Sequence, residues 1–513
     1  MKSDDYADLN HLGDEMAPQR GRALAAAAVT LLASPALAKP IEAVLRLEGH
    51  GTMAELAEAV SDPLSPRFQQ FYSTDEIRDA IGPWDAEYQT LLHSLRHAGI
   101  RVVSESPTHL LLTVLAERSV LETVFAGNLA ETMQPVVAVS GLRSPRRSRP
   151  RHRLHDESRE PFAQAKAAGT TLARIRTLYG FDALYKAGLT GAGQHIAIAT
   201  YDGFNLSDVT AYYTKQNLSP VPKIDQVTFN GAAPINAASA VETELDAEFS
   251  GALAPGAQVH VFTSAHNDDA GELQMFTAIL DDARAKVINY SWGDCESRLA
   301  AAHRADMDPV FLRAVAQGVN VMVASGDSGS DCLQDGSVMA DWPAAHPAVV
   351  AIGGTRLGTS TTKLSETGWT GSGGGISTMW PLPTWQAGLG RAYVRRSYPD
   401  VAFNADPKSG QAAWVRDGTT TPAYEVIGGT SIAAPQWSAF LALVGEARAK
   451  AGKSTLGFLN PIVYRMSATD RAAAFDDVKS GSNGAYSSAA GWDAVTGFGG
   501  LHADVLLKYL QAQ

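Results

Sequence analysis

The segment that decides the fold is "AKVINYSWGDCESRLAAAHRADMDPVFLRAVAQGVNVMVASGDSG", residues 285–329. It holds two apolar, strand-like runs at 285–293 and 319–329, with a helical pattern at 309–318 between them. Similar runs recur at "HIAIATYDG" (195–203), "AQVHVFTS" (257–264) and "AVVAIGG" (348–354). Near-continuous apolar strands that alternate with helices predict an α/β fold, in which a parallel sheet has helices on both faces. In such a sheet, functional residues gather where the strands end.

The N-terminal part of the chain has a different pattern. Between about 39 and 142, short apolar stretches alternate with helical ones such as "DAEYQTLLHSLRHAG" (85–99), which predicts a compact α+β domain. An Arg-, Pro- and Ser-rich stretch follows, and we assign 143–169 to a linker. The α/β domain then occupies 170–513. A chain of 513 residues is long enough for two or three domains.

Charge limits the classes of partner. The formal net charge is −12, which argues against a nucleic-acid partner. The exception is "RSPRRSRPRHR" (143–153), with six arginines in eleven residues. We interpret this run as a solvated linker or processing segment in preference to a nucleic-acid arm.

The apolar stretch "ALAAAAVTLLASPALA" (23–38) follows two arginines and ends in small residues. This pattern is typical of a secretory signal with a signal-peptidase site, so 1–38 is a candidate signal peptide. The acidic residues at the start of the chain suit a signal poorly, and a start at Met16 suits it better. The alternative is an amphipathic helix of the first domain. No run is long enough to predict stable membrane insertion.

The chain has two cysteines, Cys295 and Cys332. No Cys/His cluster has the spacing of a zinc site. If the protein is exported, the two cysteines could form one disulfide. If it is not, they are small buried apolar residues, and both alternatives stay open.

The stretch "GGTSIAAPQW" (428–437) presents a serine with the surroundings of a nucleophile. Ser431 follows two glycines and a threonine and precedes a long helical stretch, which predicts that it lies at the start of a helix. A helix N-terminus favours negative charge that develops there. Taken alone, Ser431 would be explained equally well as a helix N-cap.

A serine nucleophile needs a base, and none of the thirteen histidines stands in a His-Gly-Thr type of helix start. Carboxyl groups offer a better candidate. The segment "AVETELDAEFSGALAPG" (240–256) places Glu242 and Asp246 four residues apart, on one face of a helix. Like charges that close raise one pKa, so the pair can act as a base and its orienting acid. Glu244 and Glu248 form a second pair on another face, and on an ordinary acidic helix all four would be solvated.

Acyl transfer also needs a donor for the oxyanion. The segment "VMVASGDSGSD" (321–331) places Asp327 in a glycine turn after a predicted buried strand. A carboxyl group donates a hydrogen bond only while it is protonated, and an ordinary aspartate is ionised at neutral pH. Asp327 therefore suits this role only in acid or with a strongly raised pKa.

The ordered set "ETELD" (242–246), "SWG" (291–293), "SGDSG" (325–329) and "GGTSIAAP" (428–435) resembles the sedolisins, the serine-carboxyl peptidases. The resemblance covers most of the chain, because "DPLSPRFQQFYSTDEI" (62–77) looks like the signature of the family's prodomain. It implies a subtilisin-like fold, a prodomain and activity in acid.

The resemblance also implies roles for individual residues. Ser431 would be the nucleophile and Glu242 the general base, later the acid for the leaving amine. Asp246 would orient Glu242, and Asp327 would stabilise the oxyanion. Some relatives add a carboxylate after the first strand, where this chain has Thr200. The substrate cleft would be lined by Ser291, Trp292 and Gly293, although Trp292 could also be a core residue.

The segments "FDDVKSG" (475–481) and "SSAAGWDAVTG" (487–497) resemble the family's calcium site. The resemblance implies one Ca²⁺ ion, which prefers six to eight oxygen ligands. The carboxylates would come from Asp477 and Asp493, and the backbone oxygens from Val478, Ala489 and Gly491. The family usually has glycine in place of Ala489, but only a carbonyl is needed there. Without the resemblance, the two acids would be turn formers.

We therefore expect an acid-active endopeptidase made as a proenzyme, which acts on protein or peptide substrates. Its own prodomain would be an intramolecular inhibitor, removed by self-cleavage between about 155 and 172. The protein is expected to be a secreted or periplasmic monomer. The alternatives are a tripeptidyl-type exopeptidase and a catalytically inactive relative that acts by binding.

Overall fold

The computed structural model describes residues 39–125, 133–142, 148–151, 153–154, 169–235, 240–389, 393–416 and 421–513. Residues 40–513 form one compact unit. The candidate signal peptide, 1–38, lies outside the described residues, as does most of the predicted cleavage interval. None of the described helices is both long enough and apolar enough to cross a membrane.

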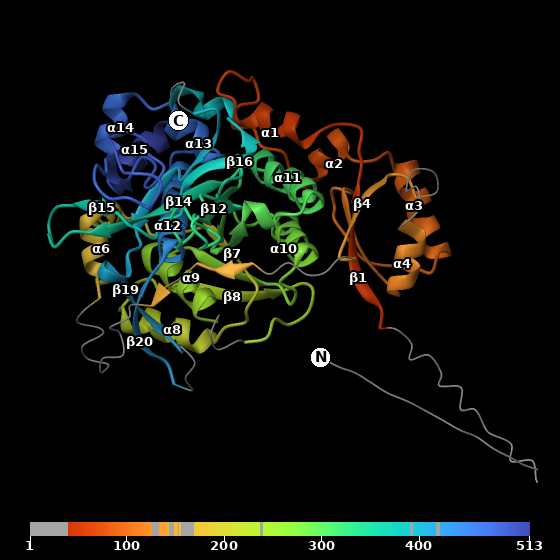
Figure 1. Cartoon of the computed structure of the whole chain (residues 1–513), viewed down its shortest axis with the longest axis horizontal. Coiled ribbons are helices and arrows are strands. Elements are labelled where there is room, and N and C mark those ends of the chain that lie inside the picture. The colour runs from red at the N-terminus through yellow and green to blue at the C-terminus, as the bar shows by residue number, and fades with distance from the viewer. Residues whose placement is uncertain are drawn as a thin grey trace, which may run out of the picture. The chain divides into compact units, whose positions relative to one another are not determined.

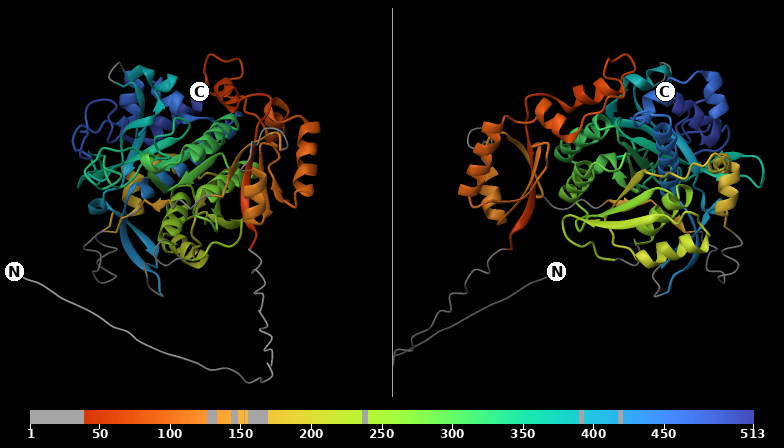
Figure 2. Two further views of the ribbon diagram at one scale, coloured as in Figure 1. Left: turned by 45° about the vertical axis from the view of Figure 1, so that its right-hand side comes forward. Right: turned by 180° about the vertical axis from the view of Figure 1, so that it is seen from behind.

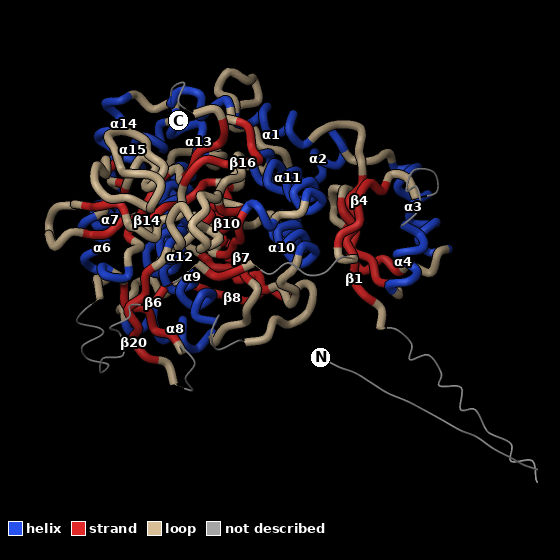
Figure 3. The backbone as a smooth tube through the Cα atoms, viewed as in Figure 1, coloured by secondary structure: helices blue, strands red, loops and turns tan. Residues whose placement is uncertain are grey.

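A ten-stranded, mostly parallel sheet forms the centre of the larger domain, and Figure 3 shows its strands in red among blue helices. The strand order is β21-β22-β18-β14-β12-β10-β7-β9-β8, and β15 pairs with β14. Neighbours are parallel from β8 to β22, whereas β21 and β15 pair antiparallel. The strands are β7 His195–Thr200, β8 Lys223–Thr228, β9 Gln258–Thr263, β10 Val287–Tyr290, β12 Asn320–Ala324, β14 Val350–Leu357, β15 Glu366–Gly368, β18 Val401–Asn404, β21 Phe475–Asp476 and β22 Gly500–Leu501.

The five predicted strands are confirmed as β7, β9, β10, β12 and β14. Every residue of β10 and β12 is buried, because both faces of this part of the sheet are covered. That coverage explains why their sequences are apolar without alternation. Strand β8 escaped prediction because it is a half-exposed edge strand, "KIDQVT", with little apolar signal.

Helices cover both faces of the sheet (Figure 1). Helices α9 and α12 pack side by side, and α12 also lies against β10, β12, β14 and β18. Helices α10 and α11 pack against each other and toward the N-terminal domain. The helices of this domain are α6 Leu172–Leu178, α7 Phe181–Lys186, α8 Leu206–Lys215, α9 Ala240–Leu253, α10 Asp269–Asp282, α11 Ala301–Ala316, α12 Thr430–Lys450, α13 Leu459–Tyr464, α14 Ala468–Ala474 and α15 Ala503–Ala512, with 3-10 turns at Glu296–Arg298, Thr384–Leu389 and Pro407–Ser409.

The N-terminal domain is the predicted α+β unit. Its four strands form an antiparallel sheet in the order β2-β3-β1-β4. The strands are β1 Ile41–Leu47, β2 Arg101–Glu105, β3 Leu111–Ala116 and β4 Val136–Ser140, and the helices are α1 Met53–Ser61, α2 Thr74–Ile81, α3 Asp85–His97 and α4 Arg118–Phe125. The domain has its own hydrophobic core between the sheet and helices α3 and α4.

The N-terminal domain docks on helices α10 and α11 (Figure 2). Arg46 on β1 forms an ion pair with Asp306 on α11, with 2.9 Å between Nε and Oδ1. Ser140 on β4 donates a hydrogen bond to the other oxygen of Asp306, at 2.5 Å. Asp306 is thus buried, and groups of the N-terminal domain donate to both of its carboxyl oxygens.

The larger domain also has three small sheets. One has the order β13-β11-β5, another β19-β20-β6, and the third pairs β16 with β17. Their strands are β5 Arg149–Pro150, β6 Arg153–Leu154, β11 Trp292–Cys295, β13 Asp341–Trp342, β16 Gly375–Pro381, β17 Arg395–Tyr398, β19 Gln411–Val415 and β20 Ala423–Gly428. Two of these sheets each take one strand from the predicted linker.

Candidate active site

The chemistry-bearing residues come from two adjacent helices and from the ends of two adjacent strands. Ser291 directly follows β10, and Asp327 lies in the turn after β12, which pairs in parallel with β10. Glu242 and Ser431 each lie in the first turn of their helix, α9 and α12, which pack together. The carboxyl ends of parallel strands thus meet the starts of two helices, as expected for a site in an α/β fold.

Ser431 is the second residue of α12. Gly429 directly before the helix has a φ of 112°, which favours glycine and lets the chain turn sharply into the helix. Gly429 is also the N-cap residue, so the alternative reading of Ser431 as an N-cap is wrong. The Ser431 side chain is completely buried.

The carboxyl group of Glu242 is completely buried beside Ser431. Burial raises the pKa of Glu242 well above its usual value, and the nearby charge of Asp327 raises it further. A hydrogen bond with the Ser431 side chain counteracts this rise, because it stabilises the ionised carboxylate. The expectation that these acids are solvated on an ordinary helix is wrong, since all fourteen residues of α9 are buried.

Asp246 lies one turn further along α9 and is also fully buried. Ser291 donates a hydrogen bond to its Oδ1 at 2.7 Å, and Asn289 donates to the Ser291 hydroxyl at 3.3 Å. Burial raises the pKa of Asp246 well above its usual value, and the charge of Glu242 adds to the rise. The two acids therefore form an electrostatically coupled pair whose protons belong to the pair.

Asp327 is 6% exposed and contacts the residue that precedes Ser431. The backbone N–H and the hydroxyl of Thr430 both donate to its Oδ1, each at 2.8 Å. The Thr430 hydroxyl oxygen in turn accepts from the Gly326 backbone N–H at 3.1 Å. These bonds fix the orientation of the Asp327 carboxyl group next to the start of α12.

The predicted linker runs directly over Ser431. The backbone N–H of Ser431 donates to the carbonyl oxygen of Arg151 at 3.0 Å, and Ser431 Oγ lies in contact with the same carbonyl group. On one side of that carbonyl, β5 pairs antiparallel with β11. On the other side, β6 pairs antiparallel with β20. The linker is thus an extended strand held on both sides of the Arg151 carbonyl group.

The backbone of the linker makes further bonds before the Arg151 carbonyl. The Arg151 N–H donates to the Ser291 carbonyl oxygen at 3.0 Å. Ser148 donates its N–H to Asn267 Oδ1 at 2.8 Å and accepts from Asn267 Nδ2 at 3.0 Å. The site therefore binds at least four residues on the N-terminal side of that carbonyl carbon.

The Arg151 side chain enters a buried pocket that ends at Asp341. Its Nη2 donates to Asp341 Oδ1, and the two side chains are 9% and 2% exposed. Two glycines form the walls: a Cβ on Gly293 would lie 3.0 Å from Arg151 Nη2, and one on Gly326 would lie 2.4 Å from Asp341 Oδ2. Burial raises the pKa of Asp341 to about 7, and the Arg151 guanidinium counteracts this rise.

Trp292 takes part through its backbone, which pairs with Pro150 of the linker. Its side chain is only 2% exposed and donates a hydrogen bond to Thr200 Oγ1 at 3.2 Å. Thr200 in turn shares a hydrogen bond of 2.7 Å with Thr243 on α9. At the position where some relatives carry a carboxylate, this chain thus has a neutral threonine network.

The expected calcium ligands lie in two neighbouring loops. Gly491 donates its N–H to Asp477 Oδ1 at 2.9 Å, and Ala489 donates to Asp493 Oδ2 at 3.0 Å. Both carboxyls therefore converge on the 489–491 turn. Ala489 is not among the described residues with positive φ, so its backbone angles suit alanine. The donor set of carboxylates and main-chain oxygens fits calcium chemistry.

This site has few acidic side chains. Across the described residues, no group of three or more His, Cys, Asp or Glu side chains is arranged to hold a metal ion. Calcium would therefore depend on main-chain oxygens, including that of the buried Val478. The exposed Lys479, with Nζ 3.4 Å from Asp477 Oδ2, supplies a positive charge at the same place.

Sequence reasoning missed the residues that hold the linker. Arg151 was part of a recognised arginine run, but nothing local set it apart from its neighbours. Asp341 and Asn267 carry no motif at all. One signal was present: if the expected self-cleavage of the arginine-rich linker takes place, the site must accept arginine near the cleaved bond.

Comparison with known families settles which peptidase class this site belongs to. The subtilase family model matches residues 204–492, and the model "Pro-kumamolisin, activation domain" matches residues 32–132. Kumamolisin from Bacillus sp. (strain MN-32) is 37% identical over 412 residues, which cover 74% of this chain and 70% of that protein. The chain belongs to the sedolisin family of serine-carboxyl peptidases.

Two more relatives span most of this sedolisin-family chain. Sedolisin from Pseudomonas sp. (strain 101) is 28% identical over 521 residues, covering 91% of this chain and 86% of the relative. Tripeptidyl-peptidase 1 from Rattus norvegicus is 26% identical over 522 residues, covering 91% and 90%.

A solved structure agrees with the fold. Pseudomonas sedolisin in complex with two molecules of pseudo-iodotyrostatin superposes with a TM-score of 0.60 at 29% identity, and covers 67% of this chain and 98% of that one. This sedolisin-family chain is therefore a serine-type peptidase with a subtilisin-like fold and an N-terminal activation domain.

Proposed function

We propose that the protein is an acid-active serine-carboxyl endopeptidase whose linker occupies its own active site until it is cut. The observation that carries this proposal is the contact of Ser431 with the Arg151 carbonyl group, within a strand that is paired on both sides. A peptide held in this way presents its carbonyl carbon to the Ser431 hydroxyl.

The proposed chemistry uses two buried carboxyls, Glu242 and Asp327, in opposite protonation states. Glu242, ionised, accepts the proton from the Ser431 hydroxyl as Oγ bonds to the carbonyl carbon. Asp327, protonated, donates a hydrogen bond to the resulting oxyanion, together with the Ser431 N–H. Glu242 then gives its proton to the leaving amine, and the acyl-enzyme forms. A water molecule then gives a proton to Glu242 as its oxygen bonds to the acyl carbon, and this proton passes to Ser431 Oγ as the C–Oγ bond breaks and the acid product leaves.

Asp246 is the proposed orienting residue. The i,i+4 spacing on α9 keeps it near Glu242, and the hydrogen bond from Ser291 fixes its own orientation. Ser291 thus has two proposed tasks, since its carbonyl oxygen also accepts from the substrate backbone at the Arg151 position. Trp292 and Gly293 would bind the preceding substrate residues as a strand.

The linker geometry favours endopeptidase action over removal of tripeptides. A tripeptidyl-peptidase must stop the substrate at its third residue before the cleaved bond, which here corresponds to Arg149. Instead, Ser148 is bound through both of its backbone groups by Asn267. A cleft that binds a fourth residue leaves room for a continuous chain. The Arg151–Asp341 pair further favours substrates with a basic residue before the cleaved bond.

Self-processing tests the proposal directly. We expect the wild-type proenzyme, purified at neutral pH and acidified, to be cut between Arg151 and His152, upstream of the interval expected from sequence. The Ser431→Ala proenzyme should stay intact, because it lacks the attacking hydroxyl. Electrophoresis with N-terminal sequencing of the products measures both outcomes.

The linker offers a matched control for this experiment. Arg151→Leu should slow the first cut about tenfold or more, because it removes the partner of buried Asp341. Arg149→Leu, two residues earlier and exposed, should process at close to the wild-type rate. Loss of the N-terminal domain from acidified Ser431→Ala, kept alone, would rule out self-cleavage.

We further propose that one Ca²⁺ ion is held by the carboxylates of Asp477 and Asp493 with main-chain oxygens of Val478, Ala489 and Gly491. Its role would be to tie together the two loops that follow β21 and precede β22. Calcium at about 100 times its Kd should stabilise the fold by about 2.7 kcal/mol. We expect chelation to lower the Tm at pH 6 by several degrees, and Mg²⁺ not to restore it.

Asp477→Asn serves as the matched variant for the calcium site. Asp477 makes few bonds apart from those to Gly491 and the exposed Lys479, so its replacement should alter little except the charge. The variant should lose the calcium-dependent rise in Tm. An unchanged Tm of the wild-type protein on chelation and re-addition would refute the site.

Export is part of the proposal, as a secreted or periplasmic monomer. Cys295 and Cys332 are bonded to each other, and disulfides persist in oxidising compartments. A peptidase that stays inhibited by its own linker until it reaches acid would be harmless while it folds and is exported.

A further inference from the structure

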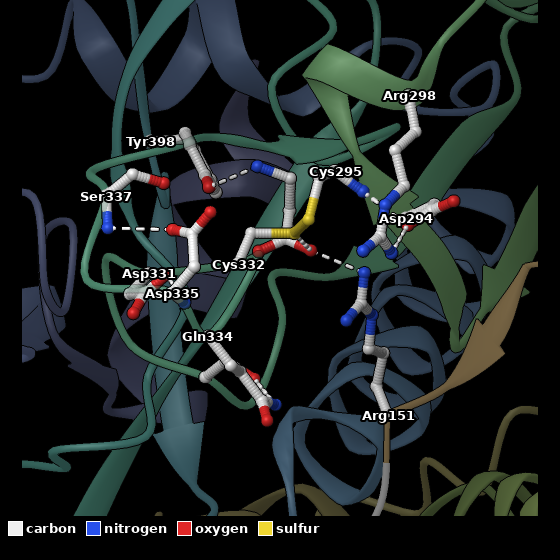
Figure 4. Close-up of a disulfide and its surroundings, with 12 residues drawn as sticks. Arg151, Asp294, Cys295, Arg298, Asp331, Cys332, Gln334, Asp335, Ser337 and Tyr398 are labelled. Carbon is white, nitrogen blue, oxygen red and sulfur yellow. Dashed lines mark hydrogen bonds and ion pairs between the residues drawn. A yellow bond between two sulfur atoms is a disulfide. The ribbon is translucent and has the colours of Figure 1, made fainter. Parts of the chain in front are cut away.

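The disulfide lies beside the pocket that receives Arg151 (Figure 4). Cys295 and Cys332 are bonded with their Cα atoms 5.6 Å apart, which settles the alternative that sequence left open. Cys295 ends β11, the strand that pairs with the linker. Cys332 lies in the loop that leads from Asp327 to Asp341. The bond therefore joins the strand that binds substrate to the loop that leads into Asp341, the first residue of β13.

One sulfur atom contacts the group that binds arginine. Cys332 Sγ lies 3.3 Å from Asp341 Oδ1, the same oxygen that accepts from the Arg151 guanidinium. A disulfide sulfur carries no proton, so this is a packing contact without a hydrogen bond. Cys295 and Cys332 are only 1% and 8% exposed, so the sulfurs exclude water from this side of the carboxylate.

Other contacts hold the Asp341 backbone, whereas Cys332 Sγ packs against Oδ1 of its carboxyl group. Its N–H donates to the Tyr398 hydroxyl at 2.7 Å, and its Cα is paired with that of Cys295. The loop between Cys332 and Asp341 is exposed at Gln334 and around it. The disulfide ties this exposed loop covalently to β11, whereas its other bonds are hydrogen bonds, such as that from the Met339 N–H to the Ser330 carbonyl oxygen at 2.9 Å.

The charges around Asp341 make its position important. The carboxyls of Asp327, Asp294 and Glu296 all disfavour its ionised form, and the Arg151 guanidinium favours it. An arginine is bound strongly here only if its guanidinium reaches Asp341 at close range. A small displacement of the carboxylate would leave it among like charges.

We propose that the Cys295–Cys332 disulfide is a positioning element for substrate specificity: it fixes Asp341 as the receptor for a basic side chain directly before the cleaved bond. This inference rests on the proposed function, because it takes the linker to be bound as a substrate. It goes beyond stability, since a bond that merely supports the fold would affect all substrates alike.

The test compares two peptides that differ only at that position, one with arginine and one with leucine. For the mature enzyme, kcat/KM is measured on both between about pH 4 and 6.5, and the arginine-to-leucine ratio is calculated. Three forms of the enzyme are assayed: the enzyme as isolated, the enzyme reduced with a phosphine, and the Cys295→Ser/Cys332→Ser double variant. A count of free thiols confirms that the disulfide has been reduced. If the variant does not fold, reduction of the folded enzyme still gives the answer.

We expect the ratio to fall about tenfold on reduction and in the double variant, mainly through a higher KM for the arginine peptide. The leucine peptide should be cleaved at a nearly unchanged rate, and the phosphine should not affect the double variant. A ratio that stays near the wild-type value, or equal losses on both peptides, would overturn the inference. If the oxidised enzyme shows no preference for arginine, the basic pocket in the proposed function is itself wrong.

Discussion

Glu242→Gln is expected to lower kcat/KM on a peptide substrate on the order of 10³- to 10⁴-fold, because glutamine cannot accept the Ser431 proton. The side chains have the same shape, and an amide oxygen can still accept a hydrogen bond from Ser431. A buried neutral amide also costs the fold less free energy than a buried, ionised carboxylate does. The fold should therefore persist, as circular dichroism and the Tm of the purified proenzyme would show, while turnover is lost.

The same helix supplies the control for this variant. Glu244 lies two residues along α9, is also buried, and accepts from the Asn205 backbone N–H at 3.2 Å. Burial raises the pKa of Glu244 to about 7, so it shares the electrostatic character of the active-site acids without facing Ser431. Glu244→Gln should retain turnover within a few fold. Near-normal turnover of Glu242→Gln would remove Glu242 as the base.

The central sheet was predictable because its signal is local. Strands β10 and β12 are buried on both faces, so their own sequences had to be apolar throughout. The spacing of Glu242 and Asp246 on one helix could also be predicted from local sequence. Their complete burial could not be predicted, because so many polar residues on a helix normally indicate a solvated face. The packing of α9 against α12, α8 and the strands β7, β9 and β19 removes water from them.

The substrate-like position of the linker was beyond sequence reasoning. It depends on pairing between residues that lie far apart in the chain, such as Trp292 with Pro150 and Ile427 with Leu154. Asp341 meets Arg151 across a separation of 190 residues. An arginine-rich run predicts a linker, but which arginine enters a pocket is decided by the register of two short strands.

The pH profile should show the second large effect: kcat/KM should fall by about 10²-fold or more between pH 4 and pH 8. A hydrogen-bond donor to the oxyanion contributes about that factor, and Asp327 donates only while protonated. In the proposed mechanism Glu242 must be ionised at the same time. The active form is therefore the one in which Asp327 holds a proton and Glu242 does not. Burial raises the pKa values of Glu242 and Asp246, and the charges of Asp327 and Glu242, respectively, raise them further, which shifts the profile above that of isolated carboxyls.

Asp327→Asn separates this explanation from simple acid loosening of the protein. The asparagine Oδ1 can keep both hydrogen bonds from Thr430, while its amide donates at any pH. The variant should be slower than wild type at pH 4 but lose far less activity by pH 8. The assay should use a peptide with leucine before the cleaved bond, because burial raises the pKa of Asp341 to about 7, and its titration would distort the profile of an arginine substrate. A wild-type enzyme that is equally fast at pH 4 and pH 7.5 on that peptide would contradict a protonated Asp327.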